Sequence, residues 1–310
     1  MNTQSNAVPE PLLESQRIAP AAMTATRPMY WSVRRELWEY RSIYIAPLVS
    51  ATIFLLGFLI SLIHLPGKMR AALALDPGQQ HELIEQPYNF AALLIMGTTF
   101  IVAVFYCLDT LHGERRDRSI LFWKSLPVSD LTTVLAKASI PVVVLPLVTF
   151  AITTVTQGIM LLLSTVALLG SGVSVATLWN HLPLSQMLLM LLDHLLGIHG
   201  LWYAPIYCWL LLVSAWARRA PFLWAALPLL AIGMVEKIAF NTSYFAAMLQ
   251  YRFTGGPESA AFKAGSMSME PLTKVSPVNF LMSPGLWIGF AVAAAFLAAA
   301  VRLRRYREPI

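Results

Sequence analysis

The stretch ASIPVVVLPLVTFAITTVTQGIMLLLSTVALL, residues 138–169, contains no Asp, Glu, Lys or Arg. About 20 apolar residues in a helix cross the hydrocarbon core of a bilayer, so this stretch is longer than one crossing needs. Pro141 and Pro146 lie near its start, where we expect a kink close to the membrane surface. The stretch therefore predicts one long, tilted transmembrane helix.

The composition of the whole chain agrees with a membrane protein. Of the 310 residues, 57% are hydrophobic and only 12% are charged, whereas roughly a quarter of the residues of a soluble domain are charged. This balance excludes a disordered chain, and a content of two cysteines excludes a secreted disulfide scaffold. We expect Cys107 and Cys208 to be packed in apolar surroundings.

Uncharged runs of similar length recur along the chain and predict an all-α, polytopic membrane protein with six transmembrane helices. The tail 1–27 precedes a single transmembrane domain, 28–310. The fifth span is the weakest, because Pro228 interrupts it and Glu236 and Lys237 lie near its end. The predicted spans are 43–65, 89–108, 138–169, 198–217, 220–240 and 284–301, with outer loops at 66–88, 170–197 and 241–283 and a cytoplasmic loop at 109–137.

The segment 184–197 is the least certain part of this topology. Its apolar part, Met187–Leu196, contains Asp193 and His194 and is too short to cross a bilayer alone. It is interpreted as a re-entrant helix, an interfacial helix or the start of the fourth span. An independent crossing would move the C-terminal arginines to the outer face, which disfavours it.

The distribution of basic residues predicts the orientation, because Lys and Arg accumulate on the cytoplasmic side. With the N-terminus inside, the inner segments hold sixteen Lys and Arg and the outer segments hold five. Both termini are therefore predicted to be cytoplasmic, and a bacterial inner (cytoplasmic) membrane is the simplest location. Because topology alone accounts for the basic residues, nucleic acid is not expected as a partner. No signal peptide is evident in 1–30.

Residues 28–42, PMYWSVRRELWEYRS, predict an amphipathic helix before the first span. Its aromatic face is expected to meet membrane lipid in the headgroup region, with the charged face toward the cytosol. A cytosolic extension of the first span is the alternative. The residues assigned to the interfacial face are Tyr30, Trp31, Val33, Leu37, Trp38 and Tyr40.

The cytoplasmic loop 109–137 alternates charged and apolar blocks. Ser119 is a plausible N-cap for a short helix that contains the apolar run 120–123 and stops at Pro127. A helix of about two turns cannot bury this face alone, so lipid or a partner protein must cover Phe122 and Trp123. Ser129 offers a second N-cap for a helix that leads into the third span.

The motif GERRDRSILFWKSLPVSD, residues 113–130, lies between the second and third of six spans. In this motif and in the overall layout, the chain resembles the permease (transmembrane) subunits of type-2-class ATP-binding-cassette (ABC) exporters from bacteria. The motif carries the specific part of the resemblance, and the six-span layout extends it at low specificity over most of the chain. The resemblance implies that the short loop helix is a coupling helix, which docks in a groove of a separate ABC ATPase subunit.

The resemblance also assigns roles within the loop. Ile120, Leu121, Phe122 and Trp123 would form an apolar plug, flanked by basic residues, in the manner of an interface hot spot. The alternative is a basic loop whose aromatic residues touch lipid headgroups. The expected ATPase contact comprises Glu114, Arg115, Arg116, Asp117, Arg118, Ser119, Ile120, Leu121, Phe122, Trp123, Lys124, Ser125 and Leu126.

The chain has no GxxxxGK[ST] motif to bind nucleotide phosphates. We therefore expect no cofactor in this chain, with ATP and Mg bound by the partner ATPase. The resemblance further implies a second permease subunit, in a homodimer or a heterodimer. An amphiphilic cargo such as a lipid, drug or peptide would suit the uncharged spans, but the sequence selects none of them.

Motifs for other functions are incomplete in this chain. His81–Glu85 begins like the zinc motif HExxH but lacks its second histidine, so an exposed outer loop is expected instead. Glu236 and Lys237 are interpreted as an interfacial ion pair. Rival functions are a stand-alone membrane enzyme acting on lipid and a non-transporting assembly or sensor protein, but no catalytic or metal-binding set was found. Hydroxyl and amide side chains that could line a path, or pack helices, are Thr98, Thr99, Thr153 and Gln157.

Overall fold

The computed structural model describes residues 26–72, 75–125, 128–170, 175–254 and 280–306, and every regular element in these ranges is a helix. The predictions for the tail 1–25, for Leu126 and Pro127, and for most of the loop 241–283 lie outside these ranges. The elements are α1 (Thr26–Glu39), α2 (Ser42–Ser61), η1 (Leu62–His64), α3 (Leu65–Ala72), α4 (Pro77–Arg116), α5 (Ser119–Ser125), α6 (Asp130–Ser139), η2 (Ile140–Val144), α7 (Leu145–Leu169), α8 (Val175–His181), α9 (Leu184–His194), η3 (Leu195–Trp202), α10 (Ala204–Trp216), α11 (Pro221–Phe240), α12 (Tyr244–Phe253) and α14 (Pro284–Tyr306).

Six helical runs among the described residues are long and apolar enough to cross a membrane, so the predicted all-α, multi-pass fold class is confirmed. They are Ser42–Ala71, Gly78–Arg116, Asp130–Leu169, Leu184–Trp202, Pro221–Phe240 and Pro284–Tyr306. The first three and the sixth exceed their predicted bounds. α4 has 40 residues, about 60 Å of helix, which is roughly twice the thickness of a hydrocarbon core.

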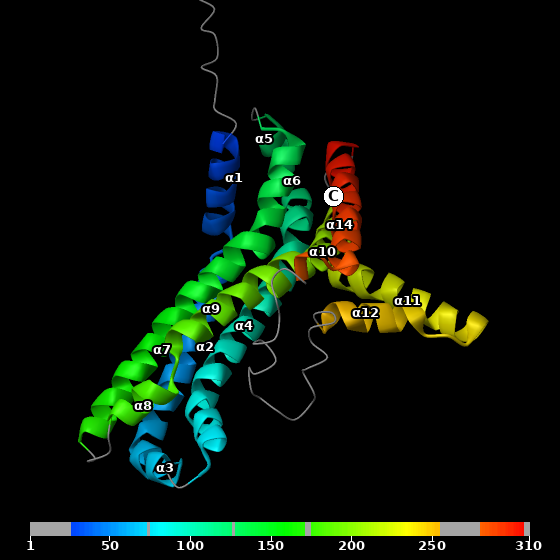
Figure 1. The fold of residues 1–310 in the computed structure, drawn as a ribbon. Coiled ribbons are helices and arrows are strands. Elements are labelled where there is room, and N and C mark those ends of the chain that lie inside the picture. Colours follow the sequence, from blue (N-terminus) through cyan, green and yellow to red (C-terminus); the bar gives the residue numbers. More distant parts are fainter. Residues whose placement is uncertain (1–25, 73–74, 126–127, 171–174, 255–279, 307–310) are drawn as a thin grey trace, which may run out of the picture.

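The fourth run differs from the sequence prediction of 198–217. α9, η3 and α10 follow one another with only Tyr203 between η3 and α10, so residues 184–216 form one helical column (Figure 1). η3 is π-helical, and Tyr203 N donates to Ile198 O five residues earlier. Residues 184–197 are thus the first part of the fourth run, which begins at Leu184. Pro205, which has no N–H to donate, occupies the first turn of α10, where helices tolerate proline.

The long helices lie side by side and diverge at their ends (Figure 1). α1, α5, α6 and the end of α14 are at the upper end of the view, and α3 and α8 are at the lower end. The core cluster of the upper end includes Ile43, Cys107, Ile140, Leu211 and Ala300. Buried Cys107 and Cys208 confirm the packing role expected for both cysteines.

The kink expected from Pro141 and Pro146 takes the form of the π-helical segment η2. Pro146 has no N–H, so the Val142 carbonyl lacks its usual helical donor. This carbonyl lies against η3, where a Cβ added to Gly200 would be only 2.7 Å from Val142 O. Two π-helical segments from different spans therefore touch at a position that requires glycine.

α11 and α12 form a helical hairpin that projects away from the long helices (Figure 1). The predicted Glu236–Lys237 ion pair is wrong, because the Glu236 carboxylate binds the start of α12. It accepts hydrogen bonds from Tyr244 N at 2.7 Å, Phe245 N at 2.8 Å and the Thr242 hydroxyl at 2.8 Å. Negative charge at a helix N-terminus satisfies free N–H groups and the helix dipole, so Glu236 fixes the hairpin turn.

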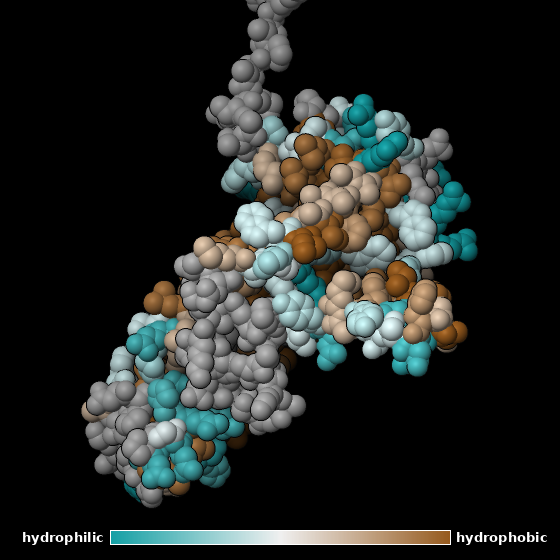
Figure 2. Space-filling view, turned by 45° about the vertical axis from the view of Figure 1, so that its right-hand side comes forward, coloured by the Kyte–Doolittle hydropathy of each residue, from teal (hydrophilic) through white to brown (hydrophobic). Residues whose placement is uncertain are grey.

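The outer surfaces of the helices remain apolar. In the space-filling view, hydrophobic residues gather over the upper half, while hydrophilic residues gather at the lower end and along the upper rim (Figure 2). α2 buries few of its residues in the chain, and α11 buries only Ala225. Lipid or another protein must cover such faces, because large apolar surfaces are unfavourable in contact with water.

Candidate functional site: a short helix on a buried charge cluster

The predicted docking helix is α5, a seven-residue helix that follows α4 after a sharp reversal. Arg118 makes this reversal with a φ of 56°, in the left-handed region that few side chains adopt. The side chains of the apolar run 120–123 point to different sides of α5. Ile120 is 2% exposed and faces the protein, whereas Leu121 is 59% exposed and Phe122 is 61% exposed.

Two side chains at the end of α5 contact neighbouring helices rather than solvent alone. The Arg35 guanidinium of α1 lies over the Trp123 ring at 3.9 Å from its centroid. Lys124 Nζ donates to the Arg305 carbonyl of α14 at 3.3 Å. α5 is therefore tied to both α1 and α14 at its C-terminal end.

Glu114 and Arg115 do not belong to the exposed surface on which the sequence placed them, because both are buried. The Glu114 carboxylate accepts a hydrogen bond from Arg35 Nη2 at 2.6 Å and lies 3.1 Å from Lys137 Nζ. It also pairs with Arg304. Three cations from α1, α6 and α14 thus converge on one carboxylate of α4.

Glu36 of α1 is the second buried carboxylate of this cluster. It accepts hydrogen bonds from Lys137 Nζ at 2.8 Å, from the Tyr106 hydroxyl at 2.9 Å and from the Thr110 hydroxyl at 3.1 Å. Lys137 has no exposed side-chain surface and also donates to Thr110 Oγ1 at 2.7 Å. Both oxygens of the Glu36 carboxylate and the ammonium of Lys137 therefore have hydrogen-bond partners inside the protein.

The cluster is electrically balanced. Arg304 Nε donates to Asp130 Oδ1 at 3.0 Å, which adds a third carboxylate at the start of α6. Buried charges cost several kcal/mol each when unpaired, so a balanced set is the arrangement that folding permits. The charge cluster, as we name this set, comprises Arg35, Glu36, Glu114, Asp130, Lys137 and Arg304.

Glu39, one turn after Arg35, lies at the edge of the charge cluster. Its Oε2 is 3.5 Å from Arg35 Nε, and its side chain is 43% exposed. Burial and the neighbouring Glu36 carboxylate raise the pKa of the Glu39 carboxyl above its ordinary value of 4.5. The ionised form of Glu39 is thus less favourable at this edge than it is in water.

Arg115 connects α4 to the end of α10. Its Nη1 donates to the Ala215 carbonyl at 2.8 Å and to the Ala217 carbonyl at 3.2 Å. The Ser214 hydroxyl accepts from the backbone N–H of Leu111 and His112 in the same region. Arg115 therefore satisfies helix-terminal carbonyls instead of flanking a docking surface.

The remaining predicted flanks are on the surface. Arg116, Asp117, Arg118 and Lys124 are exposed, and Arg116 Nε lies 3.1 Å from Asp117 Oδ1. Ser125 ends α5 and is exposed, and Ser119 is half-buried at its start. Ser129 is confirmed as the N-cap of α6, since its hydroxyl accepts from Thr132 N at 3.0 Å.

The aromatic stripe assigned to α1 is divided between two faces. Val33, Leu37 and Tyr40 pack against the core of the protein. Trp31 is 55% exposed and Trp38 is 70% exposed, and Tyr30 is also exposed. The outward face thus contains fewer residues than the sequence indicated. Val33, Leu37 and Tyr40 pack on the core, on the side of α1 where Glu36 joins the charge cluster.

Sequence reasoning missed the charge cluster, although a signal was present. Glu36 lies between Val33 and Tyr40 on the apolar stripe of its helix, and Lys137 lies between Val134 and Ala138. A charged residue inside an apolar stripe must find a partner when that stripe packs. Which partner it finds depends on helices far apart in sequence, which no periodicity specifies.

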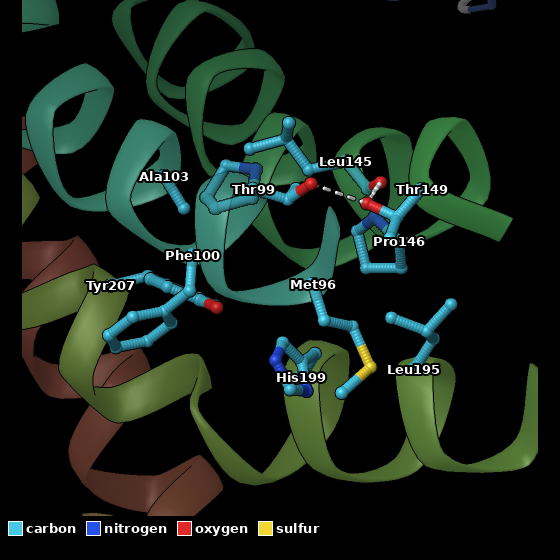
Figure 3. A pocket seen from close by; sticks show the side chains of 11 residues that line it. Met96, Thr99, Phe100, Ala103, Leu145, Pro146, Thr149, Leu195, His199 and Tyr207 are labelled. Atoms are coloured by element: carbon cyan, nitrogen blue, oxygen red, sulfur yellow. Dashed lines mark hydrogen bonds between the residues drawn. The ribbon is translucent and has the colours of Figure 1, made fainter. Parts of the chain in front are cut away.

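Of the four residues proposed to line a path, only Thr99 lines the pocket between α4, the η2–α7 junction and η3 (Figure 3). The Thr149 hydroxyl donates to Thr99 Oγ1 at 2.9 Å. Met96, Phe100 and His199 line the same pocket. Its walls are mainly apolar, with this hydroxyl pair, the Tyr207 hydroxyl and the His199 imidazole as polar groups.

The other three residues lie between helices. Thr98 Oγ1 donates to Ser50 Oγ at 3.1 Å, which links α4 to α2. Gln157 Nε2 donates to the Tyr88 carbonyl at 3.2 Å, which links α7 to α4, and Thr153 is fully buried. These contacts are of the helix-packing kind.

Within the described part of the chain, no group of three or more His, Cys, Asp or Glu side chains could hold a metal ion. His81 and Glu85, expected in an exposed loop, lie in the first turns of α4, where His81 Nε2 is 3.0 Å from Glu85 Oε1. The chain matches no family model, no curated protein and no solved structure.

Proposed function

We propose that the chain is the membrane-spanning permease subunit of an ATP-driven exporter of the type-2 ABC class, with α5 as the helix that contacts a separate ATPase subunit. The observation that carries this proposal is the pair Leu121 and Phe122, exposed on a short helix whose other face rests on the charge cluster. An exposed apolar pair with a charged rim is typical of a docking site.

The charge cluster supports a mechanical role for α5. Force applied to Leu121 and Phe122 would reach α1 through Trp123 and Arg35, and α14 through Lys124. Glu114 is three residues before the turn at Asp117 and pairs with α1, α6 and α14. A displacement of α5 would thus move three helices together with α4.

The rest of the proposal follows from this role. ATP and Mg bind to the ATPase partner, a second permease subunit completes the translocation path, and α5, the N-terminus and the C-terminus face the cytoplasm of a bacterial cell. The cargo class is amphiphilic, because the pocket lined by Thr99, Thr149 and His199 combines mainly apolar walls with a few hydroxyl and imidazole groups.

Copurification from the native host in mild detergent tests the proposal. The wild-type chain should bring down a stoichiometric P-loop protein with ATPase activity, and Leu121→Ala with Phe122→Ala should lower its recovery at least tenfold. Leu162→Ala with Val166→Ala is the matched control, since these residues are equally exposed on α7. Recovery of no ATPase, or equal recovery with both double variants, would reject the docking role of α5.

A further inference from the structure

Three residues of α1 place a half-buried guanidinium between two exposed indole rings. Trp31, Arg34 and Trp38 are spaced i, i+3 and i+7 and therefore share one face of the helix. The Arg34 guanidinium carbon lies 5.2 Å from the Trp31 ring centroid and 4.9 Å from the Trp38 ring centroid. Stacking of this kind holds a guanidinium in place while its N–H edge remains open to a ligand.

The charge of Arg34 is not neutralised by the helix that carries it. The structure places no carboxylate of the described residues within salt-bridge distance of Arg34. The two acids of α1 are otherwise engaged, since Glu36 belongs to the charge cluster and Glu39 pairs with Arg35. Arg41, two turns after Arg34, adds a second cation, and this one is exposed. The face is thus positive and aromatic.

This face continues into the exposed apolar face of α2. Tyr40 N still donates to Glu36 O, and Ile45 N donates to Arg41 O, so the backbone remains close to helical through the junction. Ile45, Leu48 and Leu56 are exposed at the spacing that extends the stripe. A face that changes from aliphatic residues to Trp and Arg matches the change from hydrocarbon to headgroups.

We propose that Trp31, Arg34 and Trp38 bind the phosphate headgroup of an anionic phospholipid. The indole rings are amphipathic and suit the boundary between headgroup and acyl chain. The guanidinium presents a planar pair of donors that matches a phosphate, which Lys would not reproduce. Lipid binding at this site needs no ATPase, so its test does not depend on the proposed transport function.

Native mass spectrometry of the full chain, released from nanodiscs of equal phosphatidylglycerol and phosphatidylcholine, tests this inference. The wild type should retain phosphatidylglycerol preferentially, and Arg34→Gln should lower the retained fraction about fivefold. Arg34→Lys should give an intermediate value, and Trp31→Ala with Trp38→Ala should lower retention at unchanged charge. Arg302→Gln removes an exposed arginine of α14 that the structure does not place between indoles, and should leave retention unchanged.

Several results would overturn the inference. Equal retention of both lipids by the wild type would do so, as would equal losses in Arg34→Gln and Arg302→Gln, which indicate diffuse charge attraction. Displacement of the bound lipid by millimolar inorganic phosphate would assign the site to a free anion. Loss of a copurifying protein from the Arg34→Gln variant, with lipid retention unchanged, would assign the face to a protein partner. Size-exclusion profiles identify any variant that fails to fold, and Arg34→Lys then provides the comparison.

Discussion

The Lys137 ammonium donates a 2.8 Å hydrogen bond to the Glu36 carboxylate, joining α6 to α1 across 101 residues of sequence. Neither side chain is accessible to solvent to any useful extent. Neighbouring groups stabilise the buried pair, because Glu114 and Thr110 accept the remaining donors of Lys137. Stability and coupling in this region should therefore respond as a unit to single substitutions.

Lys137→Met should destabilise the protein strongly, by about 3 to 5 kcal/mol, since it leaves Glu36 and Glu114 buried with one cation fewer. Thermal unfolding followed by intrinsic fluorescence in detergent measures this loss. Adding Glu36→Gln to Lys137→Met removes the uncompensated charge and should recover part of it. The exposed Lys124→Met provides the control and should unfold within a few degrees of the wild type. A similar transition temperature for Lys137→Met and Lys124→Met would contradict the burial of this cluster.

Gly200→Ala should force η2 and η3 apart, because the new methyl group would lie 2.7 Å from the Val142 carbonyl oxygen. This oxygen belongs to the backbone, which cannot move aside as a flexible side chain could. We expect a lower unfolding temperature and faster hydrogen exchange in both π-helical segments. Gly158→Ala in α7 is the matched control, since a Cβ there meets nothing within 4 Å. It should leave stability unchanged or raise it by up to about 1 kcal/mol through helix propensity. Equal behaviour of the two variants would rule out the close contact.

Gly289→Ala should release the end of α12 from the fourth and sixth spans. The Arg252 guanidinium stacks on Trp202 at 4.2 Å, its Nη1 donates to the Gly285 carbonyl at 3.0 Å, and a Cβ at Gly289 would overlap its Nη2. The flexible arginine would move away and lose both contacts. Hydrogen exchange in Tyr244–Phe253 should rise, and the increase should vanish when Gly289→Ala is made in an Arg252→Ala background. An undiminished effect in that background would show that Arg252 is not the group displaced.

Glu39→Gln should make stability less dependent on pH. A carboxyl whose pKa is raised by folding favours the folded state when protonated, so its contribution is lost as the pH rises through the folded-state pKa. At neutral pH the variant should therefore unfold at a higher temperature than the wild type. Below about pH 4, where the carboxyl is protonated in both states, the difference should disappear. A variant that is less stable than the wild type at neutral pH would show that the Arg35 contact outweighs the burial.

The six apolar runs could be predicted from the sequence because a bilayer imposes a length on any helix that crosses it. The Ser129 cap could be predicted as well, since a side-chain cap depends on residues three positions apart. The start of the fourth run could not. Asp193 and His194 interrupt the apolar run 187–196, yet the backbone stays helical through α9 and continues into the π-helical segment η3.

The candidate site was predicted only in part. The short helix after Arg118 and its exposed Phe122 follow from local pattern, whereas Ile120, Glu114 and Arg115 face inward, which the pattern did not indicate. The outward side of α1 differs for the same reason, since Val33 and Leu37 pack on the core and leave Trp31 and Trp38 outside.

Helix lengths, apolar runs and local caps are thus determined by the sequence itself, because each depends on residues within a few positions of one another. The partners of Glu36, Glu114 and Lys137 are decided only by the tertiary structure. A buried charge must be neutralised by whichever opposite charge the packed helices bring within about 3 Å, and for these residues that charge comes from α1, α6 and α14 around α4.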